Sequence, residues 1–146
     1  MTGFNHVITG VAIAVSVRHP LLAPLLSLAS HFALDSLPHF GNHPDIVPYN
    51  RAFKVYMALE VICMAIITTA GILLFPDLQL LILVCAGLAF LPDFFWIFEP
   101  QLRHRNLLTR RFYEFHHAIQ TGEHPRGWII ELGYFGLLLF VIWLYT

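Results

Sequence analysis

The sequence SHFALDSLPHF, residues 30–40, ends an apolar run with ionisable side chains, where a membrane protein would normally carry Leu and Val. His31, Asp35 and His39 are spaced four residues apart. Residues i and i+4 share one face of a helix, so His31 and Asp35 can reach a common point. Pro38 ends the predicted helix, and His39 follows it. Such groups are costly in an apolar segment unless they pair or bind a metal.

The composition indicates an all-α integral membrane protein. The chain has 146 residues, of which 58% are hydrophobic and 12% charged, whereas soluble domains carry about 25% charged residues. This length suits a single helical domain over residues 1–146. A net charge of -1 gives no indication of nucleic-acid binding, and we expect none. Cys63 and Cys85 lie in apolar runs and are interpreted as packing thiols.

Five apolar segments are predicted to be helices: residues 5–17, 20–37, 53–75, 78–98 and 128–145. The last three have about the 20 residues needed to cross ~30 Å of hydrocarbon. The first two are shorter and are expected to form a tight hairpin with Arg18 at its tip. Residues 107–120 are mixed apolar and basic, which predicts a helix at the membrane interface. No basic region precedes the first apolar run, so a cleaved signal peptide is not expected.

The distribution of Lys and Arg predicts the orientation. With five crossings, the N-terminus and both long polar loops, residues 39–52 and 99–127, lie on one side. That side carries seven basic residues, against Arg18 alone on the other: Arg51, Lys54, Arg103, Arg105, Arg110, Arg111 and Arg126. The basic side is expected to be cytoplasmic. The N-terminus then lies in the cytoplasm, and the C-terminus lies outside.

The ionisable residues of the apolar segments map to this same side, although the topology was derived from Lys and Arg alone. Imidazoles and carboxylates are the usual ligands of zinc, and they also suit manganese and iron. Adjacent residues cannot both face one point, so only one of His116 and His117 is expected to be a ligand. The predicted metal ligands are His6, His31, Asp35, Asp93 and one of His116 and His117.

Simpler roles exist for each of these residues. His31 and Asp35 can be a hydrogen-bonded pair within one helix, and His6 can be an interfacial residue, as can His39. Asp93 and Glu60 can pair with the basic residues near them. Four further histidines are expected to be exposed: His19, His43, His104 and His124.

These motifs resemble the small inner-membrane proteins known as membrane-bound metal-dependent hydrolases, the YdjM-like group. The resemblance rests on an early His6, HFALDSLPH at residues 31–39, LPD at residues 91–93, and HH at residues 116–117. It covers most of the chain. It implies a helical fold in the bacterial inner membrane, a divalent metal and hydrolase activity.

The first hypothesis for function is therefore a metal-dependent hydrolase at the cytoplasmic membrane interface, with one or two ions and zinc foremost. Glu60 or His39 would take a proton from bound water or orient a ligand. Arg51, Lys54, Arg103 and Arg105 would hold a phosphate or an anionic headgroup, or would serve only to set the topology. The substrate expected there is a lipid or another phosphoester.

The second hypothesis is a metal-binding membrane protein without catalysis, such as a transporter component, a chaperone or a structural subunit. A transporter should carry ionisable residues along a path through the bilayer. The outer half of each predicted helix is nearly free of them, which favours an interfacial site over a conduit. Membrane lipids are the expected partners, and the sequence leaves the oligomeric state open.

Overall fold

A computed structural model gives the fold and describes residues 1–146 except 42–44, 47–49, 97 and 121. The described chain is almost entirely helical, as the sequence predicts. Its helices are α1 (Gly3–Val17), α2 (Leu22–Asp35), α3 (Arg51–Leu74), the 3-10 helix η1 (Pro76–Leu78), α4 (Gln79–Trp96), α5 (Glu99–Leu102), α6 (Leu107–Ile119) and α7 (Trp128–Trp143). The five predicted segments correspond to α1, α2, α3, α4 and α7, with ends that differ by no more than two residues.

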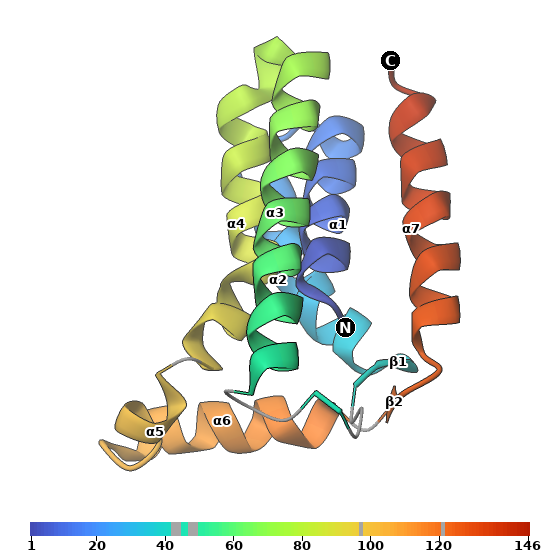
Figure 1. Ribbon diagram of the computed structural model, residues 1–146. Coiled ribbons are helices and arrows are strands. Elements are labelled where there is room, and N and C mark those ends of the chain that lie inside the picture. Colours follow the sequence, from blue (N-terminus) through green and yellow to red (C-terminus); the bar gives the residue numbers. More distant parts are fainter. Residues whose placement is uncertain (42–44, 47–49, 97, 121) are drawn as a thin grey trace.

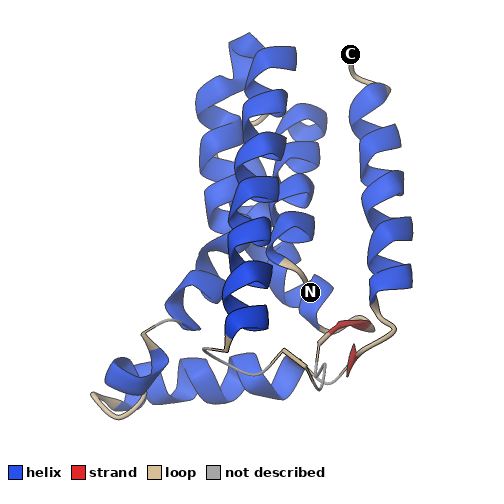
Figure 2. Cartoon of the chain, viewed as in Figure 1, coloured by secondary structure: helices blue, strands red, loops and turns tan. Residues whose placement is uncertain are grey.

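The long helices run side by side and α6 lies across one end of them (Figures 1 and 2). The chain passes along α1, returns along α2, and repeats this with α3 and α4. After α6 it rises once more along α7, so the C-terminus lies at the end opposite α6 (Figure 1). Arg18 ends α1 in the left-handed conformation, with φ 52°, and this forms the tight turn of the predicted hairpin.

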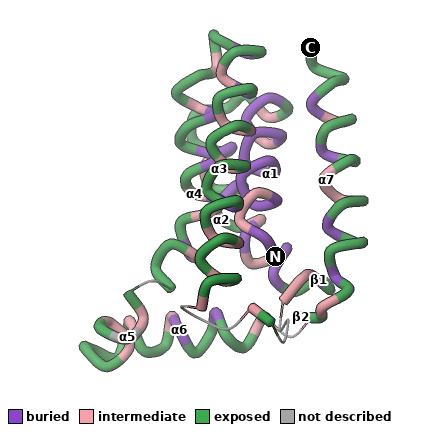
Figure 3. The backbone as a smooth tube through the Cα atoms, viewed as in Figure 1, coloured by how far each residue is buried: buried purple, intermediate pink, exposed green. Residues whose placement is uncertain are grey.

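Helix α1 forms the centre of the bundle (Figure 3). Val7, Ile8 and Val11 are buried on it, and they pack with Ile82 and Cys85 of α4 in the main hydrophobic cluster. A Cβ at Gly10 would lie 2.5 Å from the Cys85 carbonyl oxygen, so the two backbones touch there. Small residues commonly permit such contacts between membrane helices.

The outer helices expose apolar surface. Among the described residues, two helical stretches are long and apolar enough to cross a membrane, Arg51–Leu74 and Pro76–Trp96. Only 11% of the most apolar part of the first stretch is buried, which is unusual for the core helix of a soluble protein. Three further apolar helices, α1, α2 and α7, are shorter than this test requires.

A short strand pair, which the sequence does not predict, closes the end of the bundle near α6. β1 (His39–Phe40) pairs in parallel with β2 (Glu123–His124), and His39 lies opposite Glu123. A Cβ at Gly127 would lie 2.1 Å from the His39 carbonyl carbon, so glycine is needed where α7 starts against β1. The pairing ties the segment after α6 to the segment after α2, and this holds α6 beneath the bundle.

We expect Gly10→Ala to destabilise the protein by about 1–3 kcal/mol, because its methyl group must push α1 away from the α4 backbone. Gly87→Ala on α4 is the matched control: its Cβ would meet no atom within 4 Å, and Ala favours the helix. Thermal unfolding in detergent checks both variants. Equal melting temperatures for the two would show that α1 and α4 do not touch at Gly10.

Candidate metal centre

Three buried side chains from two helices form the tightest part of the site. His31 and Asp35 come from the last turns of α2, and His116 comes from α6. Asp35 Oδ2 lies 3.1 Å from His31 Nε2 and 3.2 Å from His116 Nε2. The two Nε2 atoms lie 3.1 Å from each other. Two imidazole nitrogens and a carboxylate oxygen thus form a nearly equilateral triangle.

Asp93 of α4 adds a fourth vertex to this triangle. Its Oδ1 lies 3.7 Å from His31 Nε2 and 3.6 Å from His116 Nε2. A regular tetrahedron of similar size has its centre about 2.0–2.1 Å from each vertex, which is the length of zinc bonds to nitrogen and oxygen. The four residues could therefore bind a metal ion, and their ligand atoms all lie within 4.8 Å of one another.

His6 of α1 stacks on His31, with ring centroids 4.1 Å apart, and contacts the other oxygen of the same two carboxylates. Its Nε2 is 3.1 Å from Asp35 Oδ1 and 3.6 Å from Asp93 Oδ2. The Met1 amine also contacts Asp35 Oδ1, at 2.6 Å. Each carboxylate therefore presents one oxygen to His6 and the other to His31 and His116. A carboxylate whose two oxygens face different groups in this way could bridge two cations.

The backbone of α4 fixes the orientation of His31. His31 Nδ1 lies 2.8 Å from the Ala89 carbonyl oxygen, and a carbonyl only accepts, so Nδ1 carries the proton. The lone pair of Nε2 then points into the cluster, as a metal ligand requires. Ala89 lies in the turn before Pro92, which lacks an N–H and interrupts the hydrogen-bond ladder of α4.

Helix α6 is anchored so that His116 faces α2. Asn106 caps its first turn by accepting from the Thr109 amide at 2.9 Å. The Tyr113 hydroxyl donates to the Phe95 carbonyl at 2.9 Å, and burial raises the pKa of this hydroxyl. Phe112 stacks on the His116 ring, with centroids 6.0 Å apart. These contacts join α6 to the end of α4 and orient the imidazole.

The site opens on one side to a cavity of about 430 Å³. Asp93 and His116 both line it, and the Asp93 side chain is 23% exposed. Glu60, Tyr56 and Gln120 also line this cavity. A small molecule in the cavity would therefore contact Asp93 before the more deeply buried members of the cluster.

The structure separates the two adjacent histidines, as the sequence predicts. His116 is buried in the cluster, whereas His117 is exposed and lies 3.0 Å from Glu99 Oε1. His117 is therefore not a candidate ligand.

The two residues predicted to handle protons are not in contact with the cluster in the described structure. Glu60 accepts instead from the Phe4 amide at 3.1 Å, although it lines the shared cavity. His39 is buried in β1, and its Nδ1 donates to the Leu37 carbonyl at 2.7 Å. His39 thus stabilises the turn after α2, because Pro38 forces the chain out of the helix there.

The basic residues predicted to bind phosphate lie at the same end of the bundle, outside the cluster. Arg51 and Lys54 are exposed in the first turn of α3, Arg105 is exposed after α5, and Arg103 pairs with Glu99 at 3.1 Å. Three of the histidines that were predicted to be exposed are exposed in the structure: His19, His104 and His124. His43 lies outside the described residues.

Sequence reasoning missed Glu131, the best-connected carboxylate near the cluster. It is 2% exposed on α7 and accepts from the Phe40 amide at 2.9 Å, the Asn5 amide group at 2.9 Å and the Thr2 hydroxyl. The signal was present, because an acidic residue in the first turn of an otherwise apolar helix is costly unless partnered. Glu131 fixes α7 to the start of α1.

Comparisons of the chain with family models, curated proteins and solved structures found no match. The resemblance to the YdjM-like group therefore stays a prediction from the motifs.

We expect His116→Ala to abolish stoichiometric metal binding, since it removes one of three closely spaced ligand atoms. His117→Ala is the matched control, an adjacent residue of the same type outside the cluster, and it should retain the metal. Elemental analysis of both purified variants, with their melting temperatures, checks this. Loss of metal from His117→Ala alone would place the site elsewhere.

Proposed function

We propose that the chain is a membrane-embedded, metal-dependent hydrolase with its centre at the cytoplasmic interface. The observation that carries this proposal is that His31, Asp35, Asp93 and His116 converge from three helices beside an open cavity. The motif resemblance to the YdjM-like group implies the same chemistry. Buried imidazoles and carboxylates would not be retained at membrane depth without a partner that offsets their desolvation.

Zinc is the ion that best suits two imidazoles and two carboxylates in a small tetrahedral cage, with manganese and iron as alternatives. The second oxygens of the two carboxylates, which contact His6, could serve a second ion. When bound, such an ion would lower the pKa of a water molecule to about 7 and so supply hydroxide.

We assign to Asp93 the role of general base for a water molecule in the cavity. Asp93 is the most loosely placed member of the cluster and the only one that is substantially exposed to the cavity. The other three would hold the ion, while Asp93 accepts a proton from water in the cavity. Glu60, which lines the same cavity, remains the alternative base predicted from the sequence.

A phosphoester is the substrate class that the surroundings support. Arg51 and Lys54 are exposed at the start of α3, the helix that also contributes Glu60 and Tyr56 to the cavity wall. Such side chains neutralise the charge of a phosphate. The apolar outer surface of α3 and α4 supports a position of the site beside lipid, where a lipid phosphoester could reach it.

For the topology, we propose five crossings in the bacterial inner membrane, with α6 on the cytoplasmic surface. The alternation of α1, α2, α3, α4 and α7 along one axis supports this (Figure 1). The short helix α1 would then lie in the centre of the bundle, whereas α2 keeps one face exposed.

One observation favours the second hypothesis, a static metal site without catalysis. Four protein ligands complete the tetrahedron of a structural zinc, whereas catalytic zinc keeps one position open. The two functions differ in whether Asp93 binds the ion or the water.

Measuring phosphoester hydrolysis distinguishes the catalytic centre from the static metal site. If the centre is catalytic, Asp93→Asn should retain metal, because three ligands remain, and phosphoester hydrolysis should fall by about 10²–10⁴-fold. Asp77→Asn, an exposed carboxylate of η1 at the far end of the bundle, should leave hydrolysis unchanged. Wild-type protein in nanodiscs would be assayed on lipid phosphoesters, with and without chelator. Stoichiometric metal without any turnover would favour the static site.

We expect Arg110 on α6 and Thr146 at the C-terminus to face opposite sides of the membrane. Single cysteines at these positions, in a background without Cys63 and Cys85, would be labelled in intact cells and in inverted vesicles. Arg110→Cys should react only in inverted vesicles, and Thr146→Cys only in intact cells. Reaction of both from the same side would mean an even number of crossings between them.

A further inference from the structure

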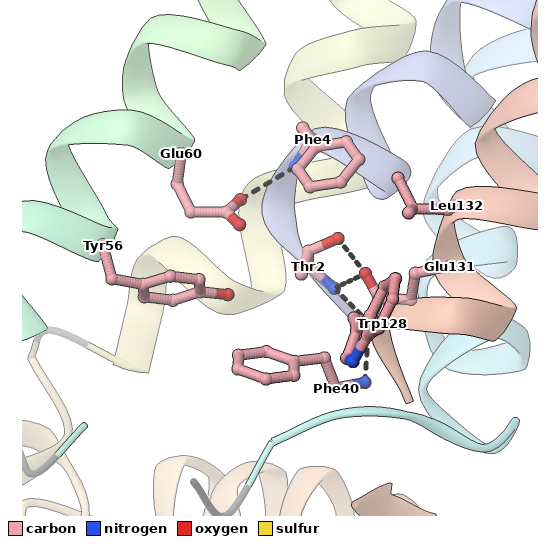
Figure 4. A pocket seen from close by; sticks show the side chains of 8 residues that line it. All are labelled: Thr2, Phe4, Phe40, Tyr56, Glu60, Trp128, Glu131 and Leu132. Atoms are coloured by element: carbon pink, nitrogen blue, oxygen red, sulfur yellow. Dashed lines mark hydrogen bonds between the residues drawn. The ribbon is translucent and has the colours of Figure 1, made fainter. Parts of the chain in front are cut away.

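A second pocket of about 330 Å³ lies beside the metal centre, between α3 and α7 and against the start of α1 (Figure 4). Four aromatic residues and two carboxylates line it, with Thr2 and Leu132 completing the wall: Phe4, Phe40, Tyr56, Trp128, Glu60 and Glu131. The two carboxylates project from opposite sides, Glu60 from α3 and Glu131 from α7 (Figure 4).

Both carboxylates are buried without a cationic partner. Glu60 is 5% exposed and accepts from the Phe4 amide, and Glu131 is 2% exposed and accepts only from neutral groups. Among the described residues, no Lys, Arg or His side chain lies within ion-pair distance of either one. Hydrogen bonds from neutral donors do not cancel the negative charge that these carboxylates carry when ionised, so the pocket is suited to a positively charged ligand.

The aromatic walls indicate which cation fits. Faces of Trp, Tyr and Phe attract ammonium groups and are the usual lining of sites for quaternary ammonium ligands. The Phe40 and Tyr56 rings are neighbours, with centroids 5.9 Å apart, and Trp128 lies on the side of Glu131, across from Tyr56 (Figure 4). A metal ion would instead need several oxygen or nitrogen ligands converging on one point, and the aromatic walls offer none.

The pocket and the cavity of the metal centre are adjacent. Thr2, Tyr56 and Glu60 line both of them. The cavity leads to Asp93 and His116, and the pocket lies between helices with exposed apolar residues such as Leu59 and Leu132. One molecule can therefore place a cation in the pocket, a phosphate near the cluster and a hydrocarbon chain against the outer helices.

We propose that this pocket binds the ammonium group of a zwitterionic amphiphile, and that the substrate is a phosphoester that carries such a group. The substrate assignment rests on the proposed hydrolase function, whereas binding of the ammonium group does not. Glu60 and Trp128 are the residues that position the ammonium group. Glu60 supplies a negative charge, and Trp128 supplies an aromatic face.

Binding would be measured by calorimetry on protein in phosphoglycerol nanodiscs, with chelator present. The probes are hexylphosphocholine and hexylphosphoglycerol, which share the chain and phosphate and differ in the ammonium. Wild-type protein should prefer the phosphocholine probe by about tenfold or more. Glu60→Gln and Trp128→Leu should each remove most of that preference. Glu114→Gln, an exposed residue of α6 paired with Arg110 at 3.3 Å, should keep it.

Equal affinity of the wild type for the two probes would overturn the ammonium site. The ammonium site would also be overturned if Glu60→Gln and Trp128→Leu both kept the full preference for the phosphocholine probe. Hydrolysis is assayed separately with metal. Phosphoester hydrolysis without headgroup preference would overturn this inference and leave the hydrolase intact. Preference for the phosphocholine probe without hydrolysis of any ester would support the site and overturn the hydrolase.

Discussion

The described structure depends on the burial of one carboxylate, that of Asp35. It is fully buried at the end of α2 and lies within 3.2 Å of imidazole nitrogens from three helices, α1, α2 and α6. A buried charge is tolerated only when its surroundings compensate it. His6 and His116 compensate Asp35, and these contacts tie the start of α1 and the end of α6 to α2. Asp93 joins from α4, so every helix that reaches the cluster is tied to this one position.

The close contact between α1 and α4 makes this convergence sterically feasible. Gly10 lets the backbone of α1 touch α4 at Cys85, and this contact places His6 on the cluster side of the bundle. At the other end of the site, Glu131 fixes the start of α1 to α7 and to β1. A short buried helix held in this way can carry ionisable groups that a helix exposed to lipid could not.

The helical fold and part of the cluster could be predicted from the sequence, because ionisable residues are conspicuous in apolar segments. The shared face of His31 and Asp35, and the separation of His116 from His117, follow from helical periodicity. The pairing of β1 with β2 could not be predicted, because it joins residues more than 80 positions apart and its close approaches are marked by three glycines, Gly41, Gly122 and Gly127. Glu131 was missed, although the reasoning applied to Glu60 fits it equally well. The roles given to Glu60 and His39 depended on which way each side chain points, and helical position does not determine that.

The nature of the first ligand shell is the most direct test of the metal centre. X-ray absorption at the edge of the metal that copurifies would be measured on the wild-type protein. We expect a shell of nitrogen and oxygen at about 2.0–2.1 Å with the scattering of two or three imidazoles, as His31 and His116, with or without His6, require. A shell containing sulfur at about 2.3 Å, or protein that folds and is active with no metal at all, would contradict a centre built on Asp35.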